Sequence, residues 1–467
     1  MTMPLWTAAE IYAALNVNIP EDLKITGISI DTRTLKPSDM FFAIQGVSQD
    51  GHDYVRKAFE QGASVAVVQQ ERADEFSACG EVLGVPDVLK SLIRLGEFAR
   101  KRTDAQIFAV TGSVGKTSTK EMLREVFSRQ GKTHASVASY NNHWGVPLTL
   151  ARMPRDTEFG IFEIGMNHPE EIRPLVRMVR PHYAIVTTVA PVHLEFFTSV
   201  NEIADAKAEI FSGLESGGVA ILNRDSIWFD RLRIHALAQY ADRVISFGEN
   251  RNADIRALSI VETVDGNTIT VSLFGREVTY RVSIPGRHMA LNSLSVLAGV
   301  HAAGGDIEQA CETLASLMAP KGRGERFALK IHDGIFTLID ESYNANPASM
   351  RAALLALGKV PICKGNRRIA VLGPMRELGK TGPQLHKELL DSVQEAGIDQ
   401  VFLAGDLMEN LFQALPKSKK TVWVEHSADL VEPLMAALAP GDVVMVKGSL
   451  STQMGLIVKA LQKYCAS

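Results

Sequence analysis

The chain has 467 residues, more than one hydrophobic core usually fills, so we expect roughly two to four domains. Hydrophobic residues make up 46% and charged residues 22% of the chain, as in ordinary soluble proteins, and a net charge of −4 offers no basic face for nucleic acid. There is no apolar run of about eighteen residues and no export signal, so we expect no membrane span. The four scattered cysteines form no C-x-x-C pair, which favours a cytoplasmic protein without disulfides or a zinc site.

The first 85 residues are expected to form a small α/β domain. Short apolar strands are predicted at 25–30, 40–44 and 64–68, and a helix at 55–61. We therefore place the first domain at 1–85.

A central domain is expected at 86–318. A charged helical segment at 86–102 comes first, and strands rich in Val and Ile are then predicted at 107–110, 160–164, 184–189 and 218–222. Such strands with helical crossovers predict a parallel, doubly wound sheet. A turn-rich section at 254–284 predicts antiparallel hairpins added to this sheet, followed by an apolar helix at 289–303.

The strongest chemical signal is the segment T-G-S-V-G-K-T-S at 111–118, which lies between a predicted strand and a predicted helix. This is the layout of a phosphate-binding loop, although Val110 replaces the usual first glycine. Backbone N–H groups and the helix dipole are expected to hold phosphate oxygens, with Lys116 on the β and γ phosphates and Thr117 on magnesium. The predicted ATP-binding residues here are Gly112, Ser113, Val114, Gly115, Lys116, Thr117 and Ser118.

Two further side chains follow predicted central strands. Glu163 closes one strand, and His193 follows the next one. Because the carboxyl ends of parallel strands face the ligand crevice, both are candidates for a metal site beside the phosphate loop. Lys207, by contrast, has the local spacing of an ordinary lysine on a helix surface.

A third domain is expected at 319–467. Its strands are predicted at 336–340, 368–372, 400–404, 421–424 and 442–446, with helices between them. This alternation predicts a Rossmann-like domain.

Taken together, these motifs resemble the ATP-dependent Mur ligases of peptidoglycan precursor synthesis. The resemblance rests on residues 111–118, Glu163-x-Gly165-Met166-Asn167-His168, His193-Leu194-Glu195, Lys207-x-x-Ile210-Phe211 and Gly286-x-His288-x-x-x-Asn292. It implies three α/β domains: an N-terminal UDP-substrate-binding domain, a central P-loop ATPase domain with a parallel sheet, and a C-terminal Rossmann-like ligase domain.

Within the family, the chain is most similar to the branch that adds a dipeptide. The motifs are Asp340-Glu341-Ser342-Tyr343-Asn344-Ala345-Asn346-Pro347 and Leu372-Gly373-x-Met375-x-Glu377-Leu378-Gly379. The resemblance implies that ATP activates UDP-MurNAc-tripeptide as an acyl phosphate, which D-Ala-D-Ala then attacks. The sequence leaves the oligomeric state open, and we take a monomer as the default expectation. The implied uridine-substrate residues are Ser29, Asp31, Thr32, Arg33 and Gly46 in the first domain, with Asn141 and Asn142 in the second.

The resemblance also implies individual roles. Lys207 is expected to form a carbamate that, with Thr117, Glu163 and His193, holds two magnesium ions. Arg323 is expected to reach the nucleotide when the domains close, and Asn292 to approach the adenine. The implied catalytic residues are Lys116, Glu163, His193, Lys207 and Arg323, and the remaining implied nucleotide contacts are Asp340, Tyr343, Asn344 and Asn346.

Three positions, Met289, Pro374 and Leu450, depart from the family pattern and leave the contacts to the dipeptide open. Two other functions are also compatible with part of the pattern. Another Mur-type or folylpolyglutamate synthase-like ligase would share the loop, metal carboxylate and lysine. A non-catalytic P-loop switch would explain only residues 111–118.

Overall fold

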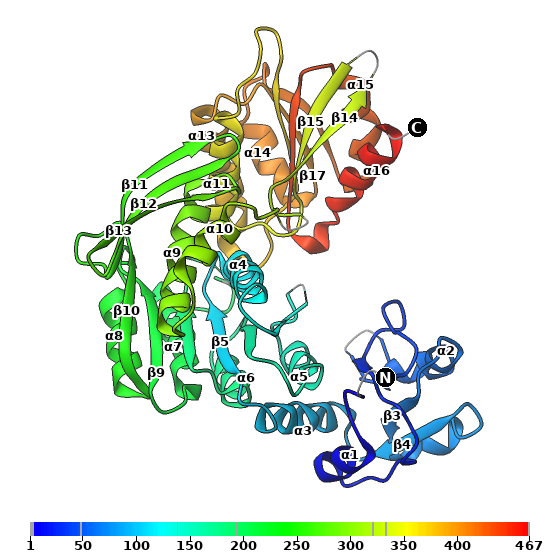
Figure 1. Cartoon of the computed structure of the whole chain (residues 1–467). Coiled ribbons are helices and arrows are strands. Elements are labelled where there is room, and N and C mark those ends of the chain that lie inside the picture. Colours follow the sequence, from blue (N-terminus) through cyan, green and yellow to red (C-terminus); the bar gives the residue numbers. More distant parts are fainter. Residues whose placement is uncertain are drawn as a thin grey trace.

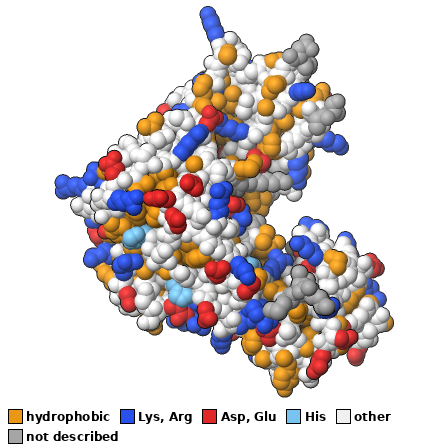
Figure 2. Space-filling view, viewed as in Figure 1, with side chains coloured by type: hydrophobic (Ala, Val, Ile, Leu, Met, Phe, Trp, Pro, Cys, Tyr) orange, Lys and Arg blue, Asp and Glu red, His pale blue; other side chains and the backbone are white. Residues whose placement is uncertain are grey.

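The structure is a computed structural model that describes residues 4–46, 49–137, 139–192, 194–319, 322–331 and 334–465, without the side chain of Thr421. Three α/β units follow one another along an arc, with the N-terminal unit at one end and the C-terminal unit at the other (Figure 1). A wide notch separates these two end units in the space-filling view (Figure 2). The central unit joins them.

The N-terminal unit contains a four-stranded parallel sheet in the order β1-β2-β3-β4. The strands are β1 (Gly27–Ser29), β2 (Asp39–Phe42), β3 (Val65–Gln69) and β4 (Glu81–Val85), and the helices are α1 (Ala8–Leu15) and α2 (Val55–Glu60). The three predicted strands and the predicted helix are confirmed. The helix α1 and the strand β4 have no counterpart in the sequence-based prediction.

Helix α3 (Val88–Lys101) connects the N-terminal and central units, and it begins where the Asp87 side chain accepts a hydrogen bond from the Lys90 N–H at 2.9 Å. Most of its buried apolar side chains belong to the core of the N-terminal unit, and Ile93 packs against a core of the central unit. The Trp6 indole donates to the Ala151 carbonyl at 2.9 Å, and the Arg102 guanidinium lies over the Trp6 ring at 3.7 Å. The first unit is therefore packed firmly onto the central one.

The central unit contains a nine-stranded sheet in the order β13-β12-β11-β10-β9-β8-β5-β7-β6. Its strands are β5 (Gln106–Thr111), β6 (Thr133–Ala135), β7 (Phe159–Glu163), β8 (Tyr183–Val186), β9 (Gly218–Asn223), β10 (Ala241–Gly248), β11 (Ile255–Thr263), β12 (Gly266–Leu273) and β13 (Arg276–Val282). Its helices are α4 (Lys116–Ser128), α5 (Gly145–Ala151), α6 (Ile172–Val179), α7 (Val200–Ala208), α8 (Phe229–Ala238), α9 (Arg287–Ala302) and α10 (Ile307–Leu314). The sheet is parallel from β6 to β11 and antiparallel beyond, which confirms the predicted hairpins.

The C-terminal unit contains a six-stranded sheet in the order β14-β15-β19-β16-β17-β18. Its strands are β14 (Glu325–Ile331), β15 (Gly334–Glu341), β16 (Arg368–Leu372), β17 (Gln400–Ala404), β18 (Lys420–Val424) and β19 (Val443–Lys447). Its helices are α11 (Pro347–Gly358), α12 (Gly382–Lys387), α13 (Leu389–Glu395), α14 (Glu409–Ala414), α15 (Val431–Ala437) and α16 (Gly455–Cys465). All five predicted strands are confirmed, and β14 adds an antiparallel edge.

Two general properties of the chain follow from these elements. Within the residues that the structure describes, no helix is both long enough and apolar enough to cross a membrane. Cys79, Cys311, Cys363 and Cys465 are free thiols.

Candidate active site

The glycine-rich loop lies between β5 and α4 and requires two residues without side chains. Gly112 has φ 152° and Gly115 has φ 87°, both in the left-handed region. A Cβ on Gly112 would lie 2.0 Å from the Thr187 hydroxyl oxygen, and a Cβ on Gly115 would lie 2.9 Å from the Asn292 amide. The Lys116 ammonium donates to the Gly112 carbonyl at 2.7 Å, so the lysine folds back over the loop.

Three segments meet at the Thr117 hydroxyl. It donates to the Glu163 carboxylate at the end of β7 at 2.8 Å, and the other oxygen of this carboxylate accepts from the Asn141 amide at 2.7 Å. The Arg323 guanidinium, from the C-terminal unit, donates to the Thr117 hydroxyl oxygen at 3.0 Å. The C-terminal unit therefore reaches the start of helix α4 directly.

A cavity of about 680 Å³ extends from this junction between the central and C-terminal units. On the central side it is lined by residues 113–118 and by α9, including Asn292. On the other side it is lined by Arg323, by the turn after β15 and by small residues of α11 such as Ala352 and Ala356. One end is thus rich in polar groups that suit phosphates, and the other has apolar walls that suit a flat base.

Most of the predicted nucleotide residues line this cavity. They are Ser113, Val114, Gly115, Lys116, Thr117, Ser118, Asn292, Arg323, Tyr343, Asn344 and Asn346. Gly112 does not line the cavity, but its carbonyl accepts a hydrogen bond from Lys116. The Arg323 guanidinium is placed over the Tyr343 ring at 4.5 Å. Asp340 is buried outside the lining, and its carboxylate accepts a hydrogen bond from the Ser342 N–H.

Lys207, on α7, is buried rather than exposed, with only 2% of its surface accessible. Its local spacing predicts a helix surface, but this prediction is wrong because the C-terminal part of α7 is buried, including Ala204, Ala206 and Ala208. Burial lowers the pKa of Lys207 well below its usual value, and the nearby Lys116 lowers it further. Burial also lowers the pKa of Lys116. The charge of Arg323 lowers this pKa further, whereas the charges of Glu163 and Glu377 raise it.

The proposed metal ligands are only partly described. His193 lies outside the residues that the structure describes. Among the residues that the structure describes, no group of three or more His, Cys, Asp or Glu side chains comes together to hold a metal ion. Thr117 and Glu163 still present a hydroxyl and a carboxylate beside each other, and oxygen donors of this kind are what magnesium prefers.

The predicted uridine-substrate residues form a separate group in the N-terminal unit. Asp31 binds Arg33 through both carboxylate oxygens, and the guanidinium of Arg33 is exposed. Ser29 and Thr32 are buried beside this pair, and the Gly46 N–H donates to the Gln49 carbonyl in a nearby turn.

The loop that carries Asn141 and Asn142 links this group to the cavity. Asn141 faces Glu163, whereas Asn142 accepts a hydrogen bond from the Gly145 N–H at the start of α5. Tyr140, between Ser139 and Asn141 in the chain, packs against the core of the N-terminal unit.

Several residues that line the cavity are absent from the sequence-based prediction of the site. The Lys447 ammonium, at the end of β19, pairs with Glu341 at 3.2 Å and donates to the Asn344 carbonyl at 2.9 Å. Arg326 and Asn223 also line the cavity. Their positions at the carboxyl ends of strands could have indicated three of these residues. Asn223 ends β9, Lys447 ends β19, and Glu341 ends β15, the strand beside β19.

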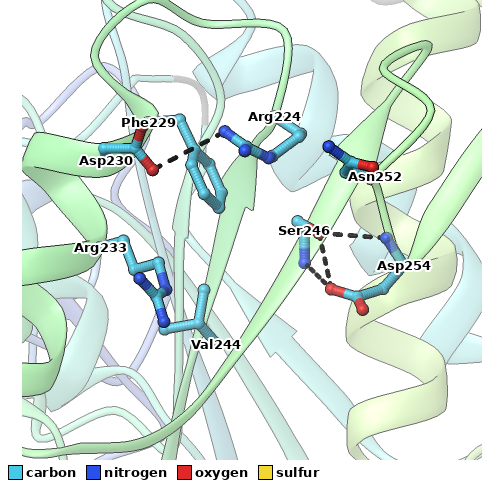
Figure 3. Close-up of a pocket in the computed structure, with 8 residues that line it drawn as sticks. All are labelled: Arg224, Phe229, Asp230, Arg233, Val244, Ser246, Asn252 and Asp254. Atoms are coloured by element: carbon cyan, nitrogen blue, oxygen red, sulfur yellow. Dashed lines mark hydrogen bonds and ion pairs between the residues drawn. The ribbon is translucent and has the colours of Figure 1, made fainter.

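A second, smaller cavity of about 260 Å³ lies at α8 and β10 of the central unit (Figure 3). Arg224 lies over the Phe229 ring at 4.1 Å and 3.8 Å from Asp230. The Asp254 carboxylate accepts hydrogen bonds from the N–H and hydroxyl of Ser246. Within this smaller cavity, Arg224, Asp230 and Asp254 thus have neighbouring groups that compensate their charges.

Comparison with known proteins defines the class to which this fold and this site belong. Three domain descriptions match in order: Mur ligase family, catalytic domain, at 24–103; Mur ligase middle domain, at 110–300; and Mur ligase, glutamate ligase domain, at 322–450. The chain belongs to the Mur ligase family. The predicted family and the predicted class of three α/β domains are therefore confirmed.

Individual relatives match over nearly the whole chain. A UDP-N-acetylmuramoyl-tripeptide–D-alanyl-D-alanine ligase of Rickettsia prowazekii is 30% identical over 98% of this chain and 100% of its own length. The Escherichia coli protein of the same name is 33% identical over 95% of each chain. A crystal structure of MurF from Acinetobacter baumannii is 27% identical, has a TM-score of 0.84, and covers 99% of this chain and 100% of its own.

Proposed function

We propose that this chain is an ATP-dependent ligase that joins D-Ala-D-Ala to UDP-MurNAc-tripeptide. The products are UDP-MurNAc-pentapeptide, ADP and phosphate, and the reaction is a step in the cytoplasmic synthesis of peptidoglycan precursors. The observation that carries this proposal is the meeting of the phosphate loop, Glu163 and Arg323 at the Thr117 hydroxyl. A nucleotide switch would explain the loop but not an arginine that arrives from a second domain.

ATP binds with its phosphates on residues 112–118 and its base between α9 and α11. Lys116 leaves its contact with the Gly112 carbonyl and holds the β and γ phosphates. Asn292 contacts the adenine from the central side, and Arg323, Asp340, Tyr343, Asn344 and Asn346 form the nucleotide-binding part of the C-terminal unit. The lining of the cavity supports all of these contacts except that of Asp340. The Asp340 carboxylate instead accepts a hydrogen bond from the Ser342 N–H and so orders the turn that carries Tyr343 and Asn344.

Magnesium fits the donor set of this site. Thr117 and Glu163 would hold it together with His193 and a carbamate on Lys207, and two such ions would screen the charge of the phosphates. The neutral amine of a lysine is the form that reacts with carbon dioxide, and burial of Lys207 favours this form. The carbamate would convert this buried lysine into an anionic oxygen ligand.

The reaction has two steps. The terminal carboxylate of the tripeptide attacks the γ phosphorus, the bond to the β-phosphate oxygen breaks, and ADP leaves with that electron pair. The free amine of D-Ala-D-Ala then attacks the carbonyl carbon of the acyl phosphate, and the tetrahedral intermediate releases phosphate as the amide forms. Lys116 and Arg323 place positive charge where the attacking carboxylate meets the phosphates of ATP. The C-terminal unit, closed over the central unit, excludes water from the acyl phosphate.

The UDP end of the acceptor binds far from ATP, in the N-terminal unit. Ser29, Asp31, Thr32, Arg33 and Gly46 hold the uridine nucleotide there. Asn141 and Asn142 guide the sugar and peptide toward Glu163, along the loop that packs on both units.

We place the domain boundaries near residues 85 and 318, giving domains of 1–85, 86–318 and 319–467.

An ADP-release assay with purified substrates tests the proposal. Product formation should require ATP, UDP-MurNAc-tripeptide and D-Ala-D-Ala together, and glutamate should not replace the dipeptide. Lys116→Ala should lower turnover by at least about 100-fold, because one preorganised charge is lost. Lys132→Ala, on an exposed lysine of the same unit, is the matched control and should retain activity. ATP turnover independent of the two peptide substrates would refute the proposal.

A further inference from the structure

Helix α5 lies beside α3, at the junction between the central and N-terminal units (Figure 1). All seven of its residues are buried, and its side chains are divided between two hydrophobic cores. Val146 and Leu150 belong to a core of the central unit. Leu148 and Ala151 belong to the core of the N-terminal unit. Because interiors are closely packed, this helix cannot shift relative to either unit without disturbing a core.

The N-terminal end of α5 is tied to the ATP site. The Gly145 N–H donates to the Asn142 side chain at 2.9 Å, which caps the first turn of the helix. The preceding residue, Asn141, donates through its amide to the Glu163 carboxylate at 2.7 Å. The Asn141 carbonyl also accepts a hydrogen bond from the Gly165 N–H at 2.9 Å. This end of the helix is therefore fixed beside the carboxylate that ends β7.

The C-terminal end of α5 is tied to the N-terminal sheet. Arg152 directly follows the helix, and its Nε–H donates to the Ile28 carbonyl at 2.6 Å. Ile28 belongs to β1, which has three residues and lies at the edge of its sheet. A strand this short makes few ladder hydrogen bonds, so a charged side chain that holds its carbonyl contributes much to fixing its position.

The residue after Ile28 begins the candidate uridine loop, residues 29–33. The buried Ser29 hydroxyl donates to the Asp31 carbonyl at 3.1 Å and accepts from the Asp31 N–H at 3.3 Å. The Asp31 carboxylate in turn accepts from the Arg33 N–H at 2.9 Å and binds the Arg33 guanidinium. The loop is thus a series of local contacts that starts next to the carbonyl held by Arg152. A shift of that carbonyl moves the start of the loop.

We infer that Arg152 is a positioning residue for the uridine-nucleotide site, because its Nε–H holds the Ile28 carbonyl and so places the loop at 29–33. The inference rests on the proposed function, in which this loop holds the UDP end of the acceptor. The other end of α5 holds Asn141 beside Glu163, so the helix sets the separation between the UDP site and the site where the acceptor carboxylate meets ATP. This role requires the hydrogen-bond donor at Nε and not the charge of the guanidinium.

Two substitutions separate the donor from the charge. Arg152→Gln places an amide N–H at the same distance along the side chain as Nε and removes the charge, whereas Arg152→Met has a similar length and no donor. The Kd for UDP-MurNAc, measured by titration calorimetry without ATP, should stay within about threefold of wild type in Arg152→Gln and rise by about 10-fold in Arg152→Met. The KM for UDP-MurNAc-tripeptide should change in the same proportion. The KM for ATP and kcat at saturating substrates should stay within about twofold of wild type in both variants.

Arg155→Met is the matched control. Arg155 binds Glu10 of the N-terminal unit at 2.8 Å, so this variant removes another contact between the same two units and should leave the Kd for UDP-MurNAc unchanged. Equal losses of affinity in Arg152→Gln and Arg152→Met would overturn the inference, because the charge would then matter rather than the donor at Nε.

Three other results would also overturn the inference: an unchanged Kd in Arg152→Met, a raised Kd in Arg155→Met, or a parallel rise of the KM for ATP in Arg152→Met. The last of these would mean that Arg152 supports the fold in general rather than the uridine loop. A wild-type protein that binds no UDP-MurNAc would instead refute the proposed function.

Discussion

At the scale of single residues, Lys207 combines burial with a depressed pKa beside the positive charge of Lys116. If it acts as a carbamate, activity should depend on dissolved carbon dioxide. We expect ADP release to fall in buffer depleted of carbon dioxide and to recover when bicarbonate is added. Lys207→Arg cannot form the carbamate and should be inactive at every bicarbonate concentration. Activity of the wild type that is independent of bicarbonate would contradict this role.

A second residue with an unusual pKa, His134 on β6, concerns stability rather than catalysis. Burial lowers its pKa to about 4, and its Nε2 lies 2.8 Å from the Thr149 carbonyl oxygen of α5. The unfolded chain, with a histidine pKa near 6.5, then binds more protons between about pH 4 and 6.5, so stability falls as the pH drops through this window. At pH 5 the loss should be between about 1 and 2 kcal/mol.

Thermal unfolding at pH 7 and pH 5 measures this effect. His134→Gln should have a smaller difference between the two melting temperatures than wild type, because glutamine does not titrate. His426→Gln, on an exposed histidine, serves as the control and should keep the wild-type difference.

The residues of the phosphate loop could be predicted because their chemistry is local: the glycines, lysine and threonine are consecutive. The burial of Lys207 could not, because it depends on what packs against α7. The contact of Asn141 with Glu163 also joins segments 22 residues apart. Local patterns do not encode such proximity.

At the scale of elements, α3 contributes side chains to the cores of the N-terminal and central units, and its first turn is capped by the side chain of Asp87. Asp87→Ala removes the acceptor for the Lys90 N–H and should destabilise this helix by about 1 kcal/mol. Amide hydrogen exchange should accelerate in the first turn of α3, near residues 88–91. Asp104→Ala, on an exposed aspartate after the helix, should not change exchange there. Unchanged protection in the Asp87 variant would show that packing alone holds this end of the helix.

The buried parallel strands were the elements that the sequence predicted best, since runs of Val, Ile and Phe between turns leave few alternatives. The strand β14 was missed because its side chains alternate between partly buried and exposed, as on an edge, and resemble a loop in composition. The short strand β6 was missed for a related reason: it has three partly buried residues and becomes a strand by pairing with β7. Edge strands depend on the neighbour that they join.

At the scale of the whole molecule, the catalytic arrangement depends on contact between the central and C-terminal units. Besides the Arg323 contact with Thr117, the Lys359 ammonium after α11 pairs with Glu262 of β11 at 3.1 Å. The hairpin of β11 and β12 extends toward the C-terminal unit in Figure 1. The sequence located Arg323 but could not indicate this pair, which joins an exposed lysine and a partly buried glutamate 97 residues apart.

Reversing one charge of this pair should favour separation of the two units. An exposed ion pair contributes up to about 1 kcal/mol, so Lys359→Glu should lower the ratio of closed to open molecules by up to about fivefold. Small-angle X-ray scattering should then give a larger radius of gyration at low salt, and the KM for ATP should rise. Lys364→Glu introduces the same charge change on an exposed residue nearby and should leave both values unchanged. Because 1 M salt reduces the Debye length to about 3 Å, the difference should disappear there, and a difference that persists would mean that Lys359→Glu disturbs α11 rather than closure.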